Sequence, residues 1–354
     1  MAHGMNGAAS GGLSRRAAMG VMGLGVAGMG VSGVGVAGAS RAEAAERKQP
    51  AAGADGASDP GAMQGAGFYR TRVGEAEVFV VSDGSFSLGD PAQILAVNAT
   101  QDEIEGALKD AYLERDGVTG QVNTLLVRTR EAVVLVDTGT GGAFGASNGK
   151  MAQNLARIGV TPADVDAVVL THAHGDHYGG LLAGPTAAGF SRARFFVSKV
   201  EHEFWRGPTP DFARSVLPKA SQDQMIQGAN RALDAIKDRM DLIADNDQIA
   251  PGIRVVMLGG HTPGHLGIRV ASGNQELLFV SDLIHHVAFG MRNPEWHVAF
   301  DVDPSEGSRV RRAMLARLAS DRALISGAHL PFPAVGHVVK DGAGFRFAPT
   351  YWGW

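Results

Sequence analysis

The sequence predicts an α+β protein built as a four-layer α/β/β/α sandwich. Short apolar runs rich in Val, Ile, Leu and Phe, a composition typical of buried strands, recur in the first half of the chain and again after residue 253. Segments with helical spacing lie between and after these runs. Two β-rich halves that each carry helices predict two facing sheets with helices on their outer faces.

The first 44 residues predict an export signal that precedes the fold. Ser14-Arg15-Arg16 comes before an uncharged stretch over 17–40, and the small residues of Ala42-Glu43-Ala44 follow it. This pattern is typical of a twin-arginine signal. A retained membrane anchor is the alternative, because the stretch is long enough to span a bilayer. Its many glycines favour a signal that is removed. We expect a periplasmic or secreted protein that starts near Ala45 and meets the membrane only during export.

Residues 45–66 predict a flexible linker, because they are mostly Ala, Gly, Ser, Asp and Pro with almost no large apolar side chain. The pattern changes at Gly67. Residues 67–354 are therefore expected to form the catalytic domain, which is long enough for a large core.

The elements of the domain are expected in the following order. Residues 77–88 predict a first hairpin with Asp83-Gly84 at its turn. The rest of the first half predicts a helix over 101–113, strands over 123–127 and 132–136, a helix over 149–158, strands over 167–170 and 194–198, and a helix over 221–239. The second half predicts strands over 253–258, 266–270 and 276–280, a helix over 304–319 and a strand over 322–325.

Four potential metal ligands follow the apolar strand over 167–170. His172 and His174 are two apart in an extended segment, so they project to the same side and can share one ion. After a turn, Asp176 and His177 would open a helix and point at a second ion, roughly 3.5 to 4 Å from the first in two-metal sites generally. A histidine-rich surface loop is the alternative. Three histidines and an aspartate at this spacing favour the two-metal site.

Three further candidate ligands also follow short apolar strands. They are His265, which closes the segment His261-Thr262-Pro263-Gly264-His265, then Asp282, and then His329. Each is expected at the same rim of a sheet, where sites in such folds usually lie. His261 is expected to shape the loop that carries His265.

This order of ligands, His-x-His-x-Asp-His followed by a His, an Asp and a final His, resembles the metallo-β-lactamase superfamily. The resemblance implies that His172, His174 and His265 hold one ion, that Asp176, His177 and His329 hold a second, and that Asp282 bridges the two. Other segments resemble the methyl parathion hydrolase branch of that superfamily. They are Gly67-Phe68-Tyr69-Arg70, Val81-Ser82-Asp83-Gly84, Leu135-Val136-Asp137-Thr138-Gly139, Glu203-Phe204-Trp205 and His329-Leu330-Pro331-Phe332-Pro333.

Composition restricts the cofactors and partners. The net charge of -4 comes from scattered charges, which leaves no basic track for nucleic acid. The absence of cysteine excludes disulfides, thiolate ligands and a cysteine nucleophile. Imidazole and carboxylate must therefore hold the two divalent ions, a ligand set that suits zinc and also admits manganese, cobalt or iron.

Several residues are candidates for supporting the site. Asp137, at the end of its strand, could accept the second N–H of a ligand histidine and fix its tautomer, or could cap a turn before Gly139. By resemblance, Phe144, Trp205 and Phe332 border the substrate pocket. The alternative for each aromatic side chain is a position in the core.

His285 and His286 follow Asp282 by three and four residues, so at least one of them is expected near the metals. In lactonases of this fold the residue at position 285 is commonly a tyrosine, and in the parathion hydrolase branch it is commonly apolar. A histidine there could hydrogen-bond a substrate oxygen or protonate a poor leaving group. His286 is expected to line the substrate pocket. A polar residue at the rim of the pocket is the alternative for either histidine.

The resemblance implies a hydrolase in which a metal-bridging hydroxide attacks an ester-like bond. Asp176 and Asp282 would orient the nucleophile and shuttle its proton. The expected substrate is a small phosphotriester or aryl ester, and the alternative is an N-acyl homoserine lactone, as in quorum-quenching enzymes. An exported metal-binding protein without turnover is an alternative of another class. A homodimer is also expected, with the apolar residues 289–300 and 351–354 at its interface.

Overall fold

The computed structural model describes residues 65–183 and 189–351. The predicted export signal, the predicted linker up to residue 64 and the last three residues of the predicted dimer interface lie outside this part of the chain. Residues 65–183 and 189–351 form two mixed sheets with helices, which confirms the predicted α+β sandwich. No helix within these residues has the length and apolar character needed to cross a membrane.

The first sheet has its seven strands in chain order. Strands β1 to β4 pair antiparallel, whereas β4 to β7 pair parallel. The strands are β1 (Phe68–Val73), β2 (Ala76–Ser87), β3 (Thr119–Arg128), β4 (Val133–Val136), β5 (Ala167–Leu170), β6 (Arg194–Ser198) and β7 (Met240–Ile243).

The second sheet has the order β14-β13-β12-β11-β10-β9-β8. Its neighbours pair antiparallel except β11 and β12, which are parallel. The strands are β8 (Gln248–Ala250), β9 (Ile253–Met257), β10 (Leu266–Ser272), β11 (Gln275–Phe279), β12 (Leu324–Ser326), β13 (Val335–Asp341) and β14 (Gly344–Pro349).

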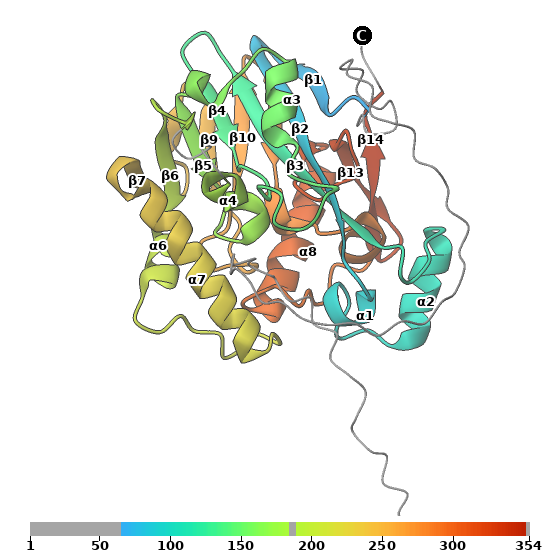
Figure 1. Cartoon of the computed structure of the whole chain (residues 1–354). Coiled ribbons are helices and arrows are strands. Elements are labelled where there is room, and N and C mark those ends of the chain that lie inside the picture. The colour runs from blue at the N-terminus through green and yellow to red at the C-terminus, as the bar shows by residue number, and fades with distance from the viewer. Residues whose placement is uncertain (1–64, 184–188, 352–354) are drawn as a thin grey trace, which may run out of the picture. The chain divides into compact units, whose positions relative to one another are not determined.

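The helices cover the outer faces of the sheets. Helices α3, α4 and α7 pack against the first sheet, and α8 packs against the second sheet beside β13 (Figure 1). The helices are α1 (Pro91–Ile94), α2 (Gln101–Asp110), α3 (Met151–Arg157), α4 (Gly175–Leu182), α6 (Lys199–Arg206), α7 (Lys219–Ile236) and α8 (Pro304–Ser320). Short helical turns cover Pro162–Asp164, Lys237–Arg239, Ser281–Leu283 and Val287–Met291.

The main core lies between the two sheets. Val80 and Val169 of the first sheet and Ile268 and Leu277 of the second belong to one buried apolar cluster. The alternate residues of the first sheet, such as Val168, face the outer helices in a second cluster. Because successive strand residues point to opposite faces, apolar residues at every position of β5 bury both sides of that strand.

The predicted hairpin with its turn at Asp83-Gly84 is wrong, because β2 runs through both residues. The pairing of β2 with β3 shifts register between Ser82 and Gly84, which marks a bulge. The bulge turns Asp83 toward the loop after β4, where its carboxylate accepts hydrogen bonds from Thr140 (2.9 Å from the backbone nitrogen) and from the backbone N–H of Met151 (2.9 Å). The bulge therefore anchors the loop that carries Phe144.

Two large apolar residues of the segment predicted to form part of a dimer interface pack inside this chain. Phe289 and Trp296 are 0% and 5% exposed and belong to an apolar cluster with residues of α2. The sequence pattern also did not predict α6, β7, β8 or the final hairpin of β13 and β14. The strands among these are short or carry many polar residues, so their hydrophobic periodicity is weak, and α6 is short, with eight residues.

Candidate metal centre

The candidate ligands lie at the carboxyl ends of strands from both sheets. The loop after β5 carries the His-x-His-x-Asp-His motif and leads into α4, in which Asp176 lies in the first turn. Asp282 follows β11, and His329 follows β12, the parallel neighbour of β11. The two halves of the sandwich therefore contribute to one site.

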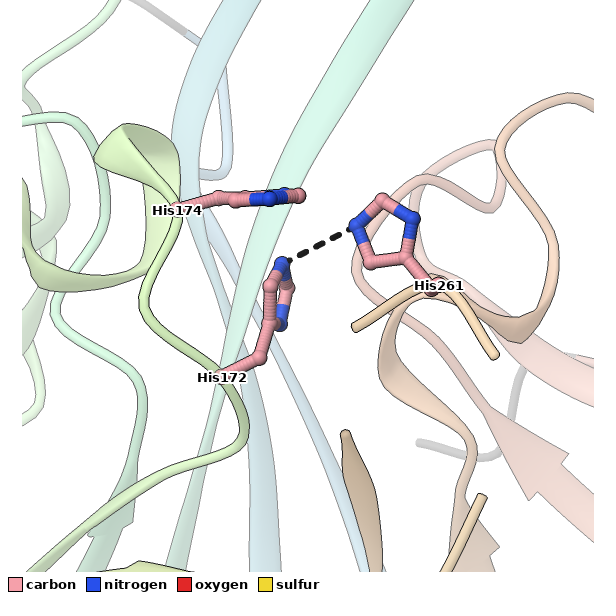
Figure 2. Close-up of side chains that lie close together, drawn as sticks. All are labelled: His172, His174 and His261. Carbon is pink, nitrogen blue, oxygen red and sulfur yellow. Dashed lines mark hydrogen bonds between the residues drawn. The ribbon is translucent and has the colours of Figure 1, made fainter. Parts of the chain in front are cut away.

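Three buried histidines form the first group. His172, His174 and His261 each offer a ring nitrogen, and these atoms all lie within 4.8 Å of one another. The Nε2 atoms of His172 and His261 are 3.1 Å apart. Figure 2 shows the three rings converging from the loops that follow β5 and β9. Three imidazoles at this separation fit a divalent ion such as zinc.

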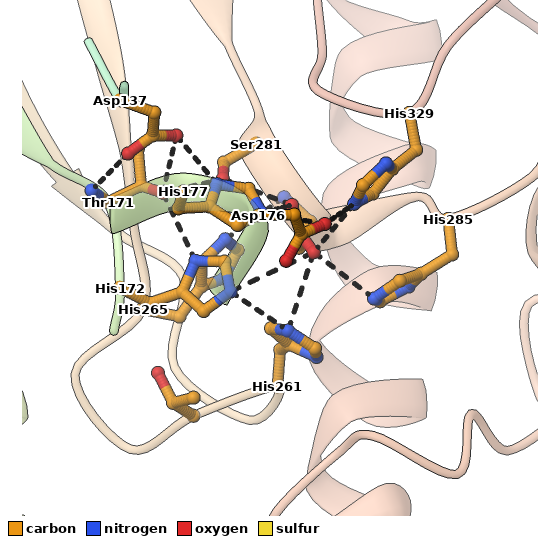
Figure 3. A network of polar contacts seen from close by, with 12 residues as sticks. Asp137, Thr171, His172, Asp176, His177, His261, His265, Ser281, His285 and His329 are labelled. Atoms are coloured by element: carbon orange, nitrogen blue, oxygen red, sulfur yellow. Dashed lines mark hydrogen bonds and ion pairs between the residues drawn. The ribbon is translucent and has the colours of Figure 1, made fainter. Parts of the chain in front are cut away.

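The second group consists of Asp176, His177, Asp282 and His329, whose ligand atoms also lie within 4.8 Å of one another. Asp282 Oδ1 is 3.1 Å from His177 Nε2, and Asp282 Oδ2 is 3.0 Å from His329 Nε2. Asp282 Oδ2 also lies 3.4 Å from His261 Nε2 of the first group. Asp282 thus contacts histidines of both groups and could bridge two ions. Figure 3 shows Asp176, His177, His261 and His329 around this one site.

The structure corrects the prediction that His265 is a ligand. Its Nδ1 donates to the carbonyl oxygen of Leu258 at 3.0 Å, and its Nε2 accepts a hydrogen bond from the backbone N–H of Asp282 at 3.2 Å. Both ring nitrogens are therefore committed to backbone. His261, four residues earlier, takes its place in the first group. The sequence held no signal that separated these two histidines.

The donor atoms fit a pair of metal ions. His174 Nε2 is buried and makes no hydrogen bond with any described residue, and His177 Nε2 faces the carboxylates of Asp176 and Asp282. Buried polar atoms are normally satisfied, because an unpaired one is costly. The two groups together contain seven buried or half-buried imidazole and carboxylate side chains and no lysine or arginine. This composition is typical of a ligand set for divalent ions.

The electrostatics favour neutral imidazoles in the first group. Burial and the neighbouring His177 hold the pKa of His172 well below its ordinary value, and burial together with His261 does the same for the pKa of His174. Burial alone would raise the pKa of Asp282, but His177, His329 and the other histidines around it hold it well below its ordinary value. The first group thus offers neutral nitrogens beside a carboxylate that stays ionised.

Two buried carboxylates orient histidines of the site. Asp137 Oδ2 lies 2.8 Å from His177 Nδ1, so it accepts that N–H and leaves Nε2 free, as the sequence predicted. Asp301 Oδ1 accepts from His261 Nδ1 at 2.7 Å in the same way. Asp301 was not predicted, because it lies in a segment without strand or motif signals. Burial raises its pKa to about 6.

His285 faces the site, and His286 does not. His285 is 6% exposed, its Nε2 is 3.4 Å from Asp282 Oδ2, and neither of its ring nitrogens hydrogen-bonds to a described residue. His286 Nδ1 instead accepts from the backbone N–H of Ala288 at 3.2 Å and caps the helical turn there. The predicted pocket role of His286 is therefore replaced by a structural one.

The predicted pocket aromatics have different surroundings. Trp205 is 1% exposed and belongs to the core beneath His174, with ring centroids 6.0 Å apart, so its predicted role as a pocket residue is wrong. Phe332 packs against the core between the sheets. Phe144 is half-buried and packs against Phe86, with ring centroids 5.1 Å apart and the rings tilted by 38°. Phe86, which the sequence pattern did not single out, lies edge-on to His329 at 6.5 Å.

Comparisons with known proteins agree with this geometry. The family model described as the metallo-beta-lactamase superfamily matches residues 117–329. The dizinc quorum-quenching lactonase AidC, solved in complex with its product, is 30% identical, with a TM-score of 0.77 over 81% of this chain and 98% of that one. The hydrolase AbOPH is 29% identical, with a TM-score of 0.74 over 82% of this chain and 100% of that one. The N-acyl homoserine lactonase AiiB of Agrobacterium fabrum is 28% identical over 187 residues, 46% of this chain and 62% of its own.

Proposed function

The chain belongs to the metallo-beta-lactamase superfamily of hydrolases, and we propose that it uses two divalent ions, expected to be zinc, to open the ring of N-acyl homoserine lactones. Two relatives named as lactonases support this substrate class. The observation that carries it within this chain is the position of His285, a buried imidazole whose Nε2 lies 3.4 Å from Asp282 Oδ2 and whose ring nitrogens hydrogen-bond to no described residue.

Each ion has its own set of residues. His172, His174 and His261 would hold the first ion, Asp176, His177 and His329 would hold the second, and Asp282 would contact both. Such ions, when bound, acidify water and polarise the oxygen of the scissile bond.

Asp176 is the residue of this set that we propose to accept the proton of the attacking water. Its side chain is 13% exposed, compared with 3% for Asp282, so it lies at the open side of the group where water arrives. Asp282 is enclosed by histidines on several sides and is better placed to orient than to exchange protons with solvent. Asp282 would thus orient the water, and Asp176 would accept its proton.

His285 would protonate the leaving oxygen. Opening a lactone releases an alkoxide, which is a poor leaving group and needs a proton as the bond breaks. A phenolate leaves without this help. Because neither ring nitrogen of His285 hydrogen-bonds to a described residue, the ring can turn one N–H toward the substrate without breaking a hydrogen bond within the described part of the chain.

The test compares one lactone with one activated ester on the zinc-loaded full-length protein. His285→Leu is expected to lower kcat for N-hexanoyl homoserine lactone by roughly 100-fold or more, and kcat for p-nitrophenyl hexanoate by less than about 10-fold. His297→Leu, a histidine outside the site, serves as the control. Equal losses on the two substrates would contradict the role of His285. Full zinc content without turnover of either substrate would support a metal-binding protein that is not an enzyme.

Phosphotriester or aryl ester hydrolysis is the second candidate. The Phe86–Phe144 pair favours it, because two aromatic rings beside His329 suit an aryl leaving group. Phe144→Ala is then expected to raise KM for methyl parathion more than KM for the lactone. A larger effect on the lactone would assign the pair to the acyl chain instead.

We also propose that the protein is exported. The support is the twin-arginine pattern at Ser14-Arg15-Arg16 and the small residues that follow the uncharged stretch. N-terminal sequencing of the protein from its native cells should find a start near Ala45. An intact Met1 or Ala2 would contradict the proposal.

A further inference from the structure

Glu201 is a buried carboxylate that contacts both histidine-bearing loops. It lies in the first turn of α6 and is 0% exposed. Its Oε1 accepts hydrogen bonds from the backbone N–H of Ala173 at 2.9 Å and from Nε1 of Trp205 at 2.6 Å. Its Oε2 accepts from the hydroxyl of Thr262 at 2.6 Å and from the backbone N–H of Gly264 at 3.0 Å. Four donors thus surround one side chain.

The two loops come from different halves of the sandwich. Ala173 stands between His172 and His174 in the loop after β5, and Thr262 directly follows His261 in the loop after β9. One oxygen of the carboxylate holds the first loop, and the other oxygen holds the second. Because a carboxylate is rigid and planar, it fixes how far apart these two loops lie.

The close approach of the second loop depends on a glycine. A Cβ atom on Gly264 would lie 2.1 Å from the backbone nitrogen of Glu201, which is closer than any real contact. Glycine at this position therefore lets the loop reach the carboxylate, and the hydrogen bond from its N–H follows.

The charge of Glu201 also bears on the metal. Within the described part of the chain it is stabilised by hydrogen bonds and forms no ion pair, and burial raises its pKa. A buried anion without a cation is costly. A divalent ion held by three neutral imidazoles in the adjoining loops would supply the missing positive charge. The ion and the ionised carboxylate should therefore stabilise each other.

We propose that Glu201 is a positioning residue that sets the spacing of the two loops and thereby the affinity of the His172, His174 and His261 group for its ion. The inference rests on the proposed metal binding but not on the proposed substrate. The proposal assigns Glu201 to the first ion. The groups that donate hydrogen bonds to its carboxylate lie beside ligands of the first group, and none lies next to Asp176, His177, Asp282 or His329 in the chain.

Glu201→Gln tests this with little change in shape. The amide replaces one acceptor oxygen by an NH₂ group, which faces two donors whichever way it is turned. We expect the first ion to bind about 10- to 100-fold more weakly and the second ion to bind as in the wild type. Zinc is titrated into the metal-free full-length protein against a chromogenic chelator, and circular dichroism checks the fold. His261→Ala identifies the binding step that belongs to the first group.

Glu203→Gln is the matched control, because Glu203 lies on the same helix, is 61% exposed and pairs with the exposed Lys199. It should bind both ions as the wild type does. The proposal is overturned if folded Glu201→Gln binds both ions normally or loses affinity for both equally. If that variant does not fold, Thr262→Val removes a single donor and should weaken the first ion about 3- to 10-fold, and unchanged binding would overturn the proposal. A wild-type chain that binds no zinc would instead refute the proposed function.

Discussion

Asp137→Asn should weaken binding of the second ion while leaving the fold intact. Asp137 Oδ2 lies 2.8 Å from His177 Nδ1 and 2.9 Å from the hydroxyl of Thr171, and its Oδ1 accepts from the backbone N–H of Thr171 at 2.8 Å. In the asparagine variant, the side-chain oxygen can still accept the hydrogen bond from the backbone N–H of Thr171 only if the amide nitrogen takes the place of Oδ2 and faces His177. That nitrogen is a donor, so His177 would have to move its proton from Nδ1 to Nε2.

The magnitude follows from where that proton goes. Nε2 of His177 is the atom that faces Asp282 at 3.1 Å and would hold the ion. A proton there competes directly with the metal. Changes in carboxylates that orient ligand histidines typically cost about 10- to 100-fold in metal affinity, which corresponds to about 1.4 to 2.8 kcal/mol.

The assay is the two-step zinc titration of metal-free protein in competition with a chelator, combined with thermal unfolding. Asp166→Asn is the control, because Asp166 also accepts a backbone N–H of β4, from Val133 at 2.8 Å, but lies at the opposite end of β5 from the motif. It should leave both zinc affinities unchanged. If Asp137→Asn is folded and binds the second ion within about 3-fold of the wild type, the tautomer argument fails.

Three further predictions concern the histidine loop and pH. His261→Ala should lose one zinc ion per chain by metal analysis. His265→Ala should retain both ions and lower the melting temperature, because both ring nitrogens of His265 hydrogen-bond to backbone. The reverse result would restore the sequence-based assignment. Burial lowers the pKa of His329, but the neighbouring carboxylates, Asp282 above all, outweigh burial and raise this pKa to about 9. The metal-free protein therefore carries a proton on His329 at pH 7, and zinc must displace that proton to bind. Zinc affinity should therefore rise with pH toward 9, and calorimetry in buffers of different ionisation enthalpy should detect proton release; no release would contradict this. Gly264→Ala should destabilise the fold by about 1 to 3 kcal/mol in urea unfolding, because its Cβ meets backbone 2.1 Å away.

Much of the fold was predictable where periodicity was strong. The strands over 167–170 and 194–198 match β5 and β6, because apolar runs bounded by polar residues mark buried parallel strands. The predicted hairpin at Asp83-Gly84 failed for an instructive reason. An Asp-Gly pair is typical of a tight turn, but here the carboxylate is needed to hold a distant loop, so the same residues form a bulge within β2.

The ligands that lie close together in the sequence were also predictable. By itself the sequence determined that Asp176 and His177 follow His172 and His174 across a strand-to-helix turn, because a spacing of a few residues fixes which side chains emerge together. It equally determined that Asp282 follows a strand end near them.

Only the tertiary structure decided which of His261 and His265 faces the metals. Both belong to one short loop, and the direction of each ring depends on its hydrogen-bond partners, which lie 40 residues away for His261 and 7 and 17 residues away for His265. Asp301 draws the ring of His261 into the site, and Leu258 and Asp282 hold His265 against backbone. Glu201, which local spacing could not reveal, fixes the loop itself from 61 and 63 residues away in the chain. Local geometry thus determined the arrangement of the motif. Hydrogen bonds from Asp301 and Glu201, which are distant in the chain, determined that His261 completes the first group.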